Sequence, residues 1–324
     1  MRNSAQAGIS VVIPVYNSEG TLRSVVARLE PALDAECAAF ELILVDDGSR
    51  DRSWEMIREL GAAHTWVIGL RLMRNYGQHN ALLCGIRAAR YSVIVTMDDD
   101  LQNPPEEIPK LLGKLREGHD VVYGWPEEEQ HGVLRDLASR ITKSALQSAM
   151  GADTARKASA FRAIRTEIRE AFADYRAPYV SVDVLLTWAT TRFAAVPVRH
   201  DARTIGRSNY TFWKLVTHAL NMMTGFSTRP LQLASLMGFA FTLFGLVVLL
   251  YVVGRYLLQG GSVPGFPFLA SVIAIFSGVQ LFVLGIIGEY IARMHFRMME
   301  RPVFAVRETT GQRSAGLADA DRPP

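Results

Sequence analysis

Three consecutive carboxylates, Asp98, Asp99 and Asp100, end an apolar run in the stretch "SVIVTMDDDLQNPPE". On an extended chain, side chains two positions apart lie on the same side, so Asp98 and Asp100 can converge on one point. Two converging carboxylates suit a hard divalent cation, and Mg²⁺ favours one or two carboxylates together with phosphate oxygens and water. Gln102 can add a neutral oxygen or orient a water molecule. A solvated acidic turn is the alternative, and the spacing alone does not decide between the two.

A second acidic pair, Asp46 and Asp47, follows the apolar run "LILV". A carboxylate at such a strand end can accept hydrogen bonds from a base or a ribose. If both acidic strands belong to one parallel sheet, their carboxyl ends open into the same cleft, which is where such sheets bind ligands. This second pair favours the cation site over the solvated turn.

The elements that would position these residues alternate along the first half of the chain. The strand patterns are "ISVVIPVYN", "FELILVDDGS", "TWVIGLRLM" and "YSVIVTMDDD", and a helical pattern follows each of them. This alternation predicts an α/β domain with a mainly parallel sheet and helices on both faces. The sequence contains neither G-x-G-x-x-G after the first strand nor G-x-x-x-x-G-K-[ST], which argues against a dinucleotide or P-loop site.

The composition excludes several classes of protein. A net charge of +3 over 324 residues is too small to indicate nucleic acid as a partner. Two cysteines, Cys37 and Cys84, provide neither a disulfide framework nor metal-ligand spacing. The first ten residues carry no long apolar stretch, so we expect no signal peptide.

Two apolar runs, Leu231–Leu258 and Phe266–Ala292, dominate the last third of the chain. Each exceeds the roughly 20 residues that a helix needs to cross a bilayer. Neither has a charge at its centre, which favours membrane spans over buried helices of a soluble core. Lysine and arginine flank the pair on its outer ends, whereas the linker "QGGSVPG" is uncharged. We therefore expect a multi-pass protein of the inner (plasma) membrane, with the N-terminal domain and both termini cytoplasmic.

These patterns predict four regions. Residues 1–210 form the cytoplasmic α/β domain, and residues 211–229 form an amphipathic helix that lies in the lipid interface, with an ordinary core-facing helix as the alternative. Residues 230–295 form two transmembrane helices joined by a short outer hairpin, and residues 296–324 form a cytoplasmic tail. Glycines along both spans permit a homo-oligomer without requiring one.

Several segments, taken in order, resemble the motifs of glycosyltransferase family 2. They are "VVIPVYNSEGTL", "ELILVDDGSRDRS", "LRLMRNYGQHNALLCGIRAA" and "VIVTMDDDLQNPPEEI". The resemblance is strongest to its polyprenyl-phosphate branch, similar to dolichyl-phosphate mannose synthase and bacterial undecaprenyl-phosphate sugar transferases. That branch also has an R-x-x-G-x-S-x-Y motif, matched by Arg203, Gly206, Ser208 and Tyr210, and a closing segment like "GEYIARMHFRMMERPVFAV".

The resemblance implies a GT-A fold and inverting transfer of a sugar from a nucleotide-sugar, by default a UDP-sugar, to a polyprenyl phosphate. It implies Mg²⁺ or Mn²⁺ as cofactor, held with the diphosphate by Asp98, Asp100 and Gln102. Arg203 would meet phosphate charge and, with Asp98 and Asp100, carry catalysis. The substrate-binding positions implied by the match are Pro14, Tyr16, Asn17, Glu19, Asp46, Asp47, Arg74, Asp99, Arg162, Arg207 and Ser208.

The sequence departs from the family pattern at three places. An arginine expected after "DVVYG" is replaced by Trp125 and Pro126, and a lysine expected after Ser208 is Asn209. The stretch "RKASAFR" lacks the acid that commonly precedes its Phe-Arg pair. A hydroxyl acceptor would need a base, but a lipid phosphate is already anionic, so the missing acid fits a phosphate acceptor.

Two other functions stay open at this point. A processive polysaccharide synthase would carry Q-x-x-R-W and more membrane helices, and the sequence has neither. The departures also leave room for a non-catalytic nucleotide-sugar-binding membrane protein.

Overall fold

The computed structural model describes residues 6–126, 157–177, 180–201, 229–259, 265–299 and 301–311. The chain divides into two compact units: a sheet unit of residues 1–215 and 301–324, and a helical unit of residues 216–300. Three residues of the predicted site, Arg203, Arg207 and Ser208, lie outside the described residues, as does nearly all of the predicted amphipathic segment 211–229.

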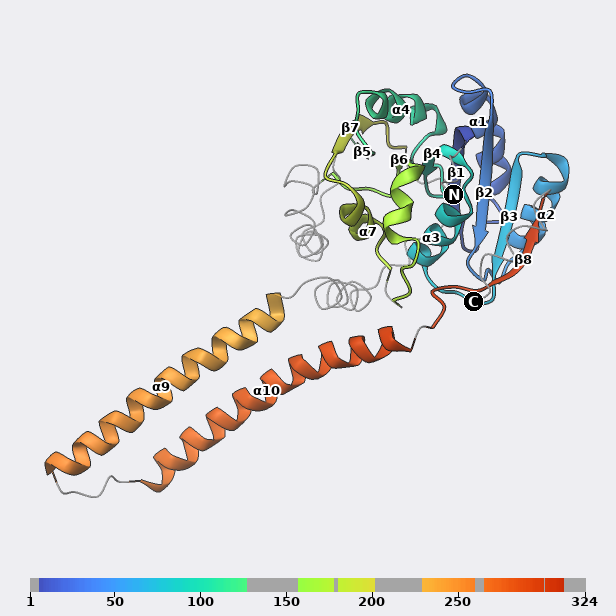
Figure 1. Cartoon of the computed structure of the whole chain (residues 1–324). Coiled ribbons are helices and arrows are strands. Elements are labelled where there is room, and N and C mark those ends of the chain that lie inside the picture. The colour runs from blue at the N-terminus through green and yellow to red at the C-terminus, as the bar shows by residue number, and fades with distance from the viewer. Residues whose placement is uncertain are drawn as a thin grey trace. The chain divides into compact units, whose positions relative to one another are not determined.

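Among the described residues, eight strands form one sheet in the order β7-β5-β6-β4-β1-β2-β3-β8 (Figure 1). β4, β1, β2 and β3 are parallel to one another, and β5 is parallel to β7. β6 and β8 run antiparallel to their neighbours. The predicted α/β architecture with a mainly parallel sheet is therefore confirmed. The strands are β1 (Gln6–Val15), β2 (Phe40–Asp46), β3 (Val67–Leu72), β4 (Tyr91–Thr96), β5 (Val121–Pro126), β6 (Arg162–Arg165), β7 (Phe193–Val198) and β8 (Val306–Thr310).

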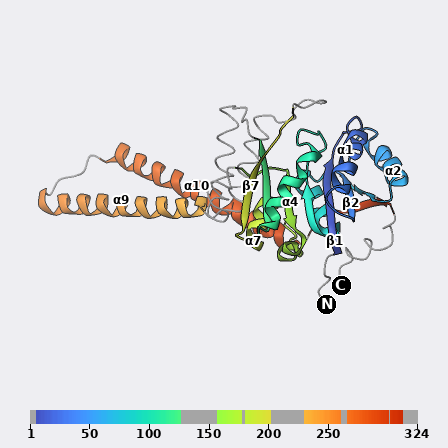
Figure 2. The same cartoon turned by 90° about the horizontal axis from the view of Figure 1, so that it is seen from above.

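Helices pack against the sheet because its central strands are apolar on both faces (Figure 2). On one face, Leu29 of α1 and Ile57 of α2 join Ile13 of β1 in a single buried cluster. On the other face, α3 lies so close that a Cβ on Gly85 would be 2.3 Å from Cγ1 of Val12. The helices of this unit are α1 (Leu22–Asp34), α2 (Ser53–Ala63), α3 (Gln78–Ala88), α4 (Ile108–Arg116) and α7 (Val182–Ala189), with 3₁₀ turns η1 (Pro105–Glu107) and η2 (Thr166–Phe172).

The strand β8 was not evident from the sequence. Its residues, "VRETT", have no apolar alternation, because β8 lies at the sheet edge beside β3 and is largely exposed. Residues 301–311 therefore belong to the sheet unit, although the sequence placed residues 296–324 in a tail. Since β7 precedes the helical unit and β8 follows it, the helical unit is an insertion between two strands of one sheet.

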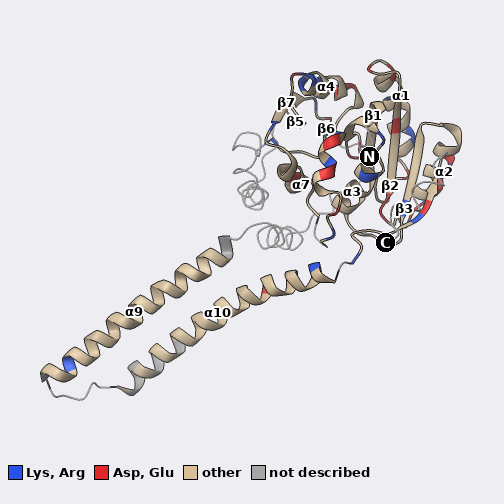
Figure 3. Cartoon of the chain, in the orientation of Figure 1, with Lys and Arg blue, Asp and Glu red and all other residues tan. Residues whose placement is uncertain are grey.

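The helical unit contains two long helices, α9 (Arg229–Gln259) and α10 (Phe266–Met298). Within the described residues, both are long and apolar enough to cross a membrane, over Leu231–Leu258 and Ile275–Met298. Charged side chains are sparse along them, as Figure 3 shows. In the described part of the chain, the polypeptide leaves the sheet before α9 and re-enters it after α10.

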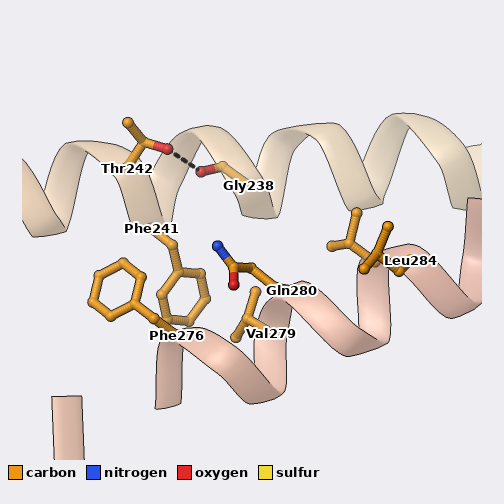
Figure 4. A pocket seen from close by; sticks show the side chains of 8 residues that line it. Gly238, Phe241, Thr242, Phe276, Val279, Gln280 and Leu284 are labelled. Carbon is orange, nitrogen blue, oxygen red and sulfur yellow. Dashed lines mark hydrogen bonds between the residues drawn. The ribbon is translucent and has the colours of Figure 1, made fainter. Parts of the chain in front are cut away.

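The two long helices contact each other through aromatic side chains and enclose a pocket (Figure 4). The ring of Phe276 on α10 packs edge-on against Phe241 of α9, with centroids 5.8 Å apart. Thr242 donates a hydrogen bond to the carbonyl oxygen of Gly238, at 2.8 Å, which satisfies its hydroxyl within α9. The side chain of Gln280 points from α10 toward α9 and places one amide in an otherwise apolar pocket.

Candidate active site

Hydrogen bonds join the loop after β1 to the loop after β2. The Asn17 side chain accepts from the Arg50 backbone N–H at 2.8 Å, and the Asn17 N–H donates to Ser49 Oγ at 3.0 Å. Glu19 accepts from the Arg52 N–H at 2.9 Å. Asn17 has a φ of 56°, a left-handed conformation that asparagine tolerates. The predicted roles of Asn17 and Glu19 in binding substrate stay predictions, since in this structure both tie loops together.

Two other predicted residues of the first strand end differ in exposure. Pro14 is buried in β1. Tyr16 follows the strand and is 41% exposed, so its ring is open to stack on a flat ligand such as a base. An exposed aromatic at the carboxyl end of a parallel strand therefore fits the predicted nucleoside contact.

The paired carboxylates Asp46 and Asp47 lie at the end of β2: Asp46 is the last residue of the strand, and Asp47 follows it. Asp46 is fully buried; its Oδ1 accepts from the Ser49 N–H at 3.0 Å, and its Oδ2 lies 3.5 Å from Nε of Arg71. Among the described residues, Asp46 Oδ2 has no hydrogen-bond partner. An acceptor left in this state at a strand end can take an N–H or O–H of a bound ligand.

Asp47 ties the loop after β2 to the loop after β3. Its carboxylate accepts from the backbone N–H groups of Tyr76, at 2.7 Å, and Gly77, at 2.9 Å. Burial raises the pKa of Asp47 to about 6, although these two hydrogen bonds act in the opposite direction. Next to it, Gly48 has a φ of 71°, and an added Cβ would lie 2.7 Å from the Asn75 nitrogen. The Asp-Asp-Gly turn thus packs directly against the loop that carries Arg74.

Arg74 is exposed, and its guanidinium lies over the ring of Tyr76 at 4.6 Å from the centroid. This cation–π contact holds the side chain along the loop after β3. Arg74 therefore lies in the loop after β3, next to the Asp-Asp-Gly turn; its predicted role in binding substrate stays a prediction.

The three carboxylates after β4 have different surroundings. Asp98 Oδ1 accepts from Nε2 of Gln78 at 2.7 Å, and Asp100 Oδ1 accepts from the Gln102 backbone N–H at 3.1 Å. Burial raises the pKa of Asp99 to about 6; Asp100 adds to the rise, and a hydrogen bond with Ser18 of the loop after β1 opposes it. Asp99 thus faces β1, while Asp98 is held toward α3.

The backbone at this strand end is strained. Leu101 has a φ of 57°, and it and Asn17 are the non-glycine residues with positive φ in the described part of the chain. Such conformations cost about 1–3 kcal/mol and gather at functional sites. Both occur directly beyond neighbouring parallel strands, β1 and β4, where the sequence predicted the site.

The donor set at this strand end fits a hard divalent cation. Asp98 and Asp100 offer carboxylate oxygens, and Asp100 is 8% exposed, so its charge needs a cationic partner or hydrogen bonds. Among the described residues, no three His, Cys, Asp or Glu side chains are grouped so that together they could hold a metal ion. A Mg²⁺ or Mn²⁺ ion bound here would need phosphate oxygens and water as further ligands. Gln102 lies beside Asp100 and is partly buried.

The end of β7 is attached to this acidic loop. The Asp201 N–H donates to the Gln102 carbonyl oxygen at 2.8 Å, and the Arg199 N–H donates to Glu107 at 3.3 Å. The R-x-x-G-x-S-x-Y motif begins two residues further along the chain, at Arg203. The last described residue before the motif is therefore held at the acidic loop.

Arg162 lies beneath the site rather than on its surface. It is 1% exposed in β6; its guanidinium forms an ion pair with Asp183 of α7, and its Nε donates to Thr96 Oγ1 at 3.0 Å. The hydroxyl of Tyr123 donates to the same Asp183 carboxylate at 2.9 Å. The Arg162 guanidinium is therefore engaged by Asp183 and Thr96 inside the protein. Its predicted contact with substrate stays a prediction.

Sequence reasoning missed Gln78 and Asp183. Gln78 opens α3 and contacts Asp98 directly. The available hint was that Gln78 lies within "RNYGQHN", a segment that resembles the family pattern. The resemblance alone gave no role for the glutamine. Asp183 gave no signal, since a single acid in the apolar stretch "VSVDVLLTW" is ordinarily an exposed helix residue.

The family model described as glycosyl transferase family 2 matches residues 10–172. A relative from Shewanella sediminis is 34% identical over 97% of this chain and 96% of its own length, and one from Pseudomonas aeruginosa is 36% identical over 96% and 93%. Both are named undecaprenyl-phosphate 4-deoxy-4-formamido-L-arabinose transferase.

The chain belongs to glycosyltransferase family 2. The resemblance to the polyprenyl-phosphate branch of that family is confirmed, and the chain is a glycosyltransferase.

Solved structures confirm the GT-A fold. Glucosyl-3-phosphoglycerate synthase from Mycobacterium tuberculosis superposes with a TM-score of 0.51 at 22% identity, over 67% of this chain and 78% of that chain. A second crystal structure, of a mycobacterial protein, gives a TM-score of 0.52 at 22% identity. At this identity the likeness concerns the fold alone.

Proposed function

We propose that this glycosyltransferase moves a sugar from a UDP-sugar to the phosphate of an undecaprenyl-type lipid, with inversion, at the cytoplasmic face of the inner membrane. The observation that carries the proposal is that the named relatives align along nearly their whole length, including the two long apolar helices. The product would be a lipid-linked sugar for modification of a cell-envelope glycan. Transfer to a lipid phosphate also agrees with the missing acid in the stretch "RKASAFR", since a phosphate acceptor needs no base.

In this proposal, the donor nucleoside binds where the loops after β1, β2 and β3 meet. Tyr16 stacks on the base, and Asp46 Oδ2, the buried acceptor without a hydrogen-bond partner among the described residues, accepts from the base or ribose. Asn17 and Asp47 shape the floor through their loop contacts, and Pro14 lies below them, buried in β1. Arg74, with Glu19 on the opposite loop, borders the same subsite.

Asp98, Asp100 and Gln102 would hold Mg²⁺ or Mn²⁺, and the bound cation would neutralise charge on the leaving diphosphate. The mycobacterial synthase was crystallised as a complex with Mn²⁺ and UDP, which supports a divalent cation here by analogy. Gln78 orients Asp98 through its 2.7 Å hydrogen bond. Arg203, Arg207 and Ser208 meet the phosphate of the acceptor lipid, and the long helices keep the site at the membrane, where that lipid lies.

The test uses the purified full-length protein in detergent, undecaprenyl phosphate, Mn²⁺ or Mg²⁺, and a panel of labelled UDP-sugars. The names of the relatives make UDP-4-deoxy-4-formamido-L-arabinose the first donor to try. We expect label to enter a lipid that is extracted into organic solvent. Labelled polymer without a lipid product would refute lipid phosphate as the acceptor.

The metal assignment is tested with Asp98→Asn and Asp100→Asn, which keep side-chain size and remove charge. Each substitution should remove several kcal/mol of the charge stabilisation that the bound cation gives the leaving diphosphate. The rate of sugar transfer should then fall about a hundredfold or more. Asp34→Asn, at an exposed carboxylate near the end of α1, is the matched control and should keep full activity. Full activity in both site variants would rule out the assignment.

A further inference from the structure

A row of charged side chains crosses the sheet from the proposed nucleoside subsite to its edge. Asp46 of β2 is paired in register with Arg71 of β3, and Arg71 is paired with Glu308 of β8. Residues directly opposite on adjacent strands project on the same face, so an arginine stands between two carboxylates. One of the two carboxylates, Glu308, belongs to β8, the strand that follows the helical insertion in the sequence.

The buried end of this row depends on Arg71. Asp46 is fully buried, and Nε of Arg71 lies 3.5 Å from its Oδ2. An ionised carboxylate in such a place is costly unless a cation lies beside it. The position of the Arg71 side chain therefore affects the orientation that Asp46 presents to a ligand.

Trp54 and Glu308 hold Arg71 from the other side. The Arg71 guanidinium lies over the Trp54 ring at 5.6 Å, and Trp54 is 2% exposed. The indole N–H of Trp54 donates to Glu308 Oε2 at 3.1 Å, and Nε of Arg58 lies 4.0 Å from Glu308 Oε1. Glu308 thus fixes the ring on which Arg71 rests and places a second negative charge beside that arginine.

We propose that Glu308 is a positioning residue for donor binding: with Trp54, it holds Arg71 against Asp46, so that β8 completes the nucleoside subsite. This inference rests on the proposed function, because it takes Asp46 as the acceptor for the base or ribose of a nucleoside diphosphate. Residues before and after the helical insertion are then both needed for donor affinity. A chain cut before α9 would retain Asp46 and lose the residue that orients it.

The first measurement is the affinity of the full-length protein in detergent for UDP, GDP and CDP with Mn²⁺. Glu308→Ala should weaken the tightest of these about three- to tenfold, in the range that residues of a coupled network produce. Glu308→Gln, which keeps an acceptor for Trp54 but no charge, should fall between wild type and alanine. Arg307→Gln is the matched control, because the Arg307 side chain is exposed and forms no ion pair with any other described residue.

Steady-state kinetics with the donor separate positioning from chemistry. Glu308→Ala should raise KM for the donor with little change in kcat, because the lost interaction is the same in the ground state and the transition state. Donor affinity in Glu308→Ala and Glu308→Gln within the range of Arg307→Gln would overturn the proposal. So would a fall in kcat with an unchanged KM.

A second measurement needs no ligand and separates this inference from the proposed function. Hydrogen exchange of the full-length protein should be faster at residues 46–49 in Glu308→Ala than in wild type or Arg307→Gln. Unchanged exchange there contradicts the positioning role, even if nucleotide binds. Glu308→Ala could also release β8, which would appear as faster exchange at residues 306–310. In that case, exchange at residues 46–49 in the milder variant Glu308→Gln decides whether Glu308 has the positioning role. A wild-type protein that binds none of the three nucleotides would refute the proposed donor, and the exchange comparison would still decide the role of Glu308.

Discussion

The ion pair between Arg162 and Asp183 should be a main determinant of stability in the sheet unit. Arg162 is 1% exposed, and it depends on Asp183 for charge neutralisation. Replacing Asp183 with alanine leaves a buried guanidinium without its partner, and breaking buried pairs in this way costs about 3–5 kcal/mol. The Asp183 side chain is 20% exposed, which lets water reach the pair, so we expect the lower end, about 3 kcal/mol.

For a unit of this size, about 3 kcal/mol corresponds to a fall in Tm of roughly 6–12 °C. The assay is thermal unfolding of the detergent-purified protein, followed by intrinsic fluorescence. The double variant Arg162→Met with Asp183→Leu should recover most of the loss, because an apolar pair replaces the ions without leaving one unpaired. If Arg162→Met keeps the wild-type Tm and raises KM for donor or acceptor instead, Arg162 binds substrate and the structural reasoning is refuted.

Two further predictions concern the Asp-Asp-Gly turn. Gly48→Ala should destabilise the protein by about 1–3 kcal/mol, since its φ of 71° is unfavourable for alanine and its Cβ would meet the Asn75 backbone. The matched control in thermal unfolding is Gly113→Ala, whose new Cβ would have no atom within 4 Å. Equal Tm values for the two variants would contradict the argument. Burial raises the pKa of Asp47 to about 6, so the folded state keeps a proton that the unfolded chain releases near pH 4, and stability should fall as pH rises between these values. In Asp47→Asn, the slope of Tm with pH between about 4 and 6 should be smaller than in wild type. An unchanged slope would mean that other groups cause the pH dependence of stability.

The central fold could be predicted because its signals are local. β1 to β4 are continuous apolar runs, and amphipathic helices follow them, so the period of the pattern alone separates strand from helix. The carboxyl ends of parallel strands then share one edge, which is why Asp46 and Asp98 could be placed together without coordinates.

The other parts of the fold could not be predicted, because they depend on contacts between segments that are distant in the sequence. β6 is four residues long and begins with Arg162, so its sequence resembles a polar loop; it is a strand because β4 and β5 supply hydrogen bonds on both sides. β8 is an edge strand with an exposed face, which removes the alternation that marks a strand. Burial of Arg162 was equally hidden, since a lone arginine is usually exposed unless paired, and its partner Asp183 lies 21 residues away.

The site itself could be predicted by position more readily than by role. The sequence predicted that Asp98 and Asp100 share one side of a strand end. In the structure β4 ends at Thr96, and each carboxylate has its own hydrogen bond beyond the strand. It did not indicate that Asn17 and Glu19 hold two loops together, because those contacts join positions more than thirty residues apart. The predicted roles at Arg203, Arg207 and Ser208 stay predictions.

The insertion of the helical unit between β7 and β8 sets an order of synthesis. A ribosome makes β1 to β7 first, then both long apolar helices, and only then the strand that covers the edge of β3. Until then β3 presents unpaired backbone groups, which in other proteins invite association with another chain. A nascent chain that stalls in the helices, or fails to insert them, therefore carries an open sheet edge that chaperones and proteases can recognise. Completion of the sheet is in this way coupled to the synthesis of the helical unit.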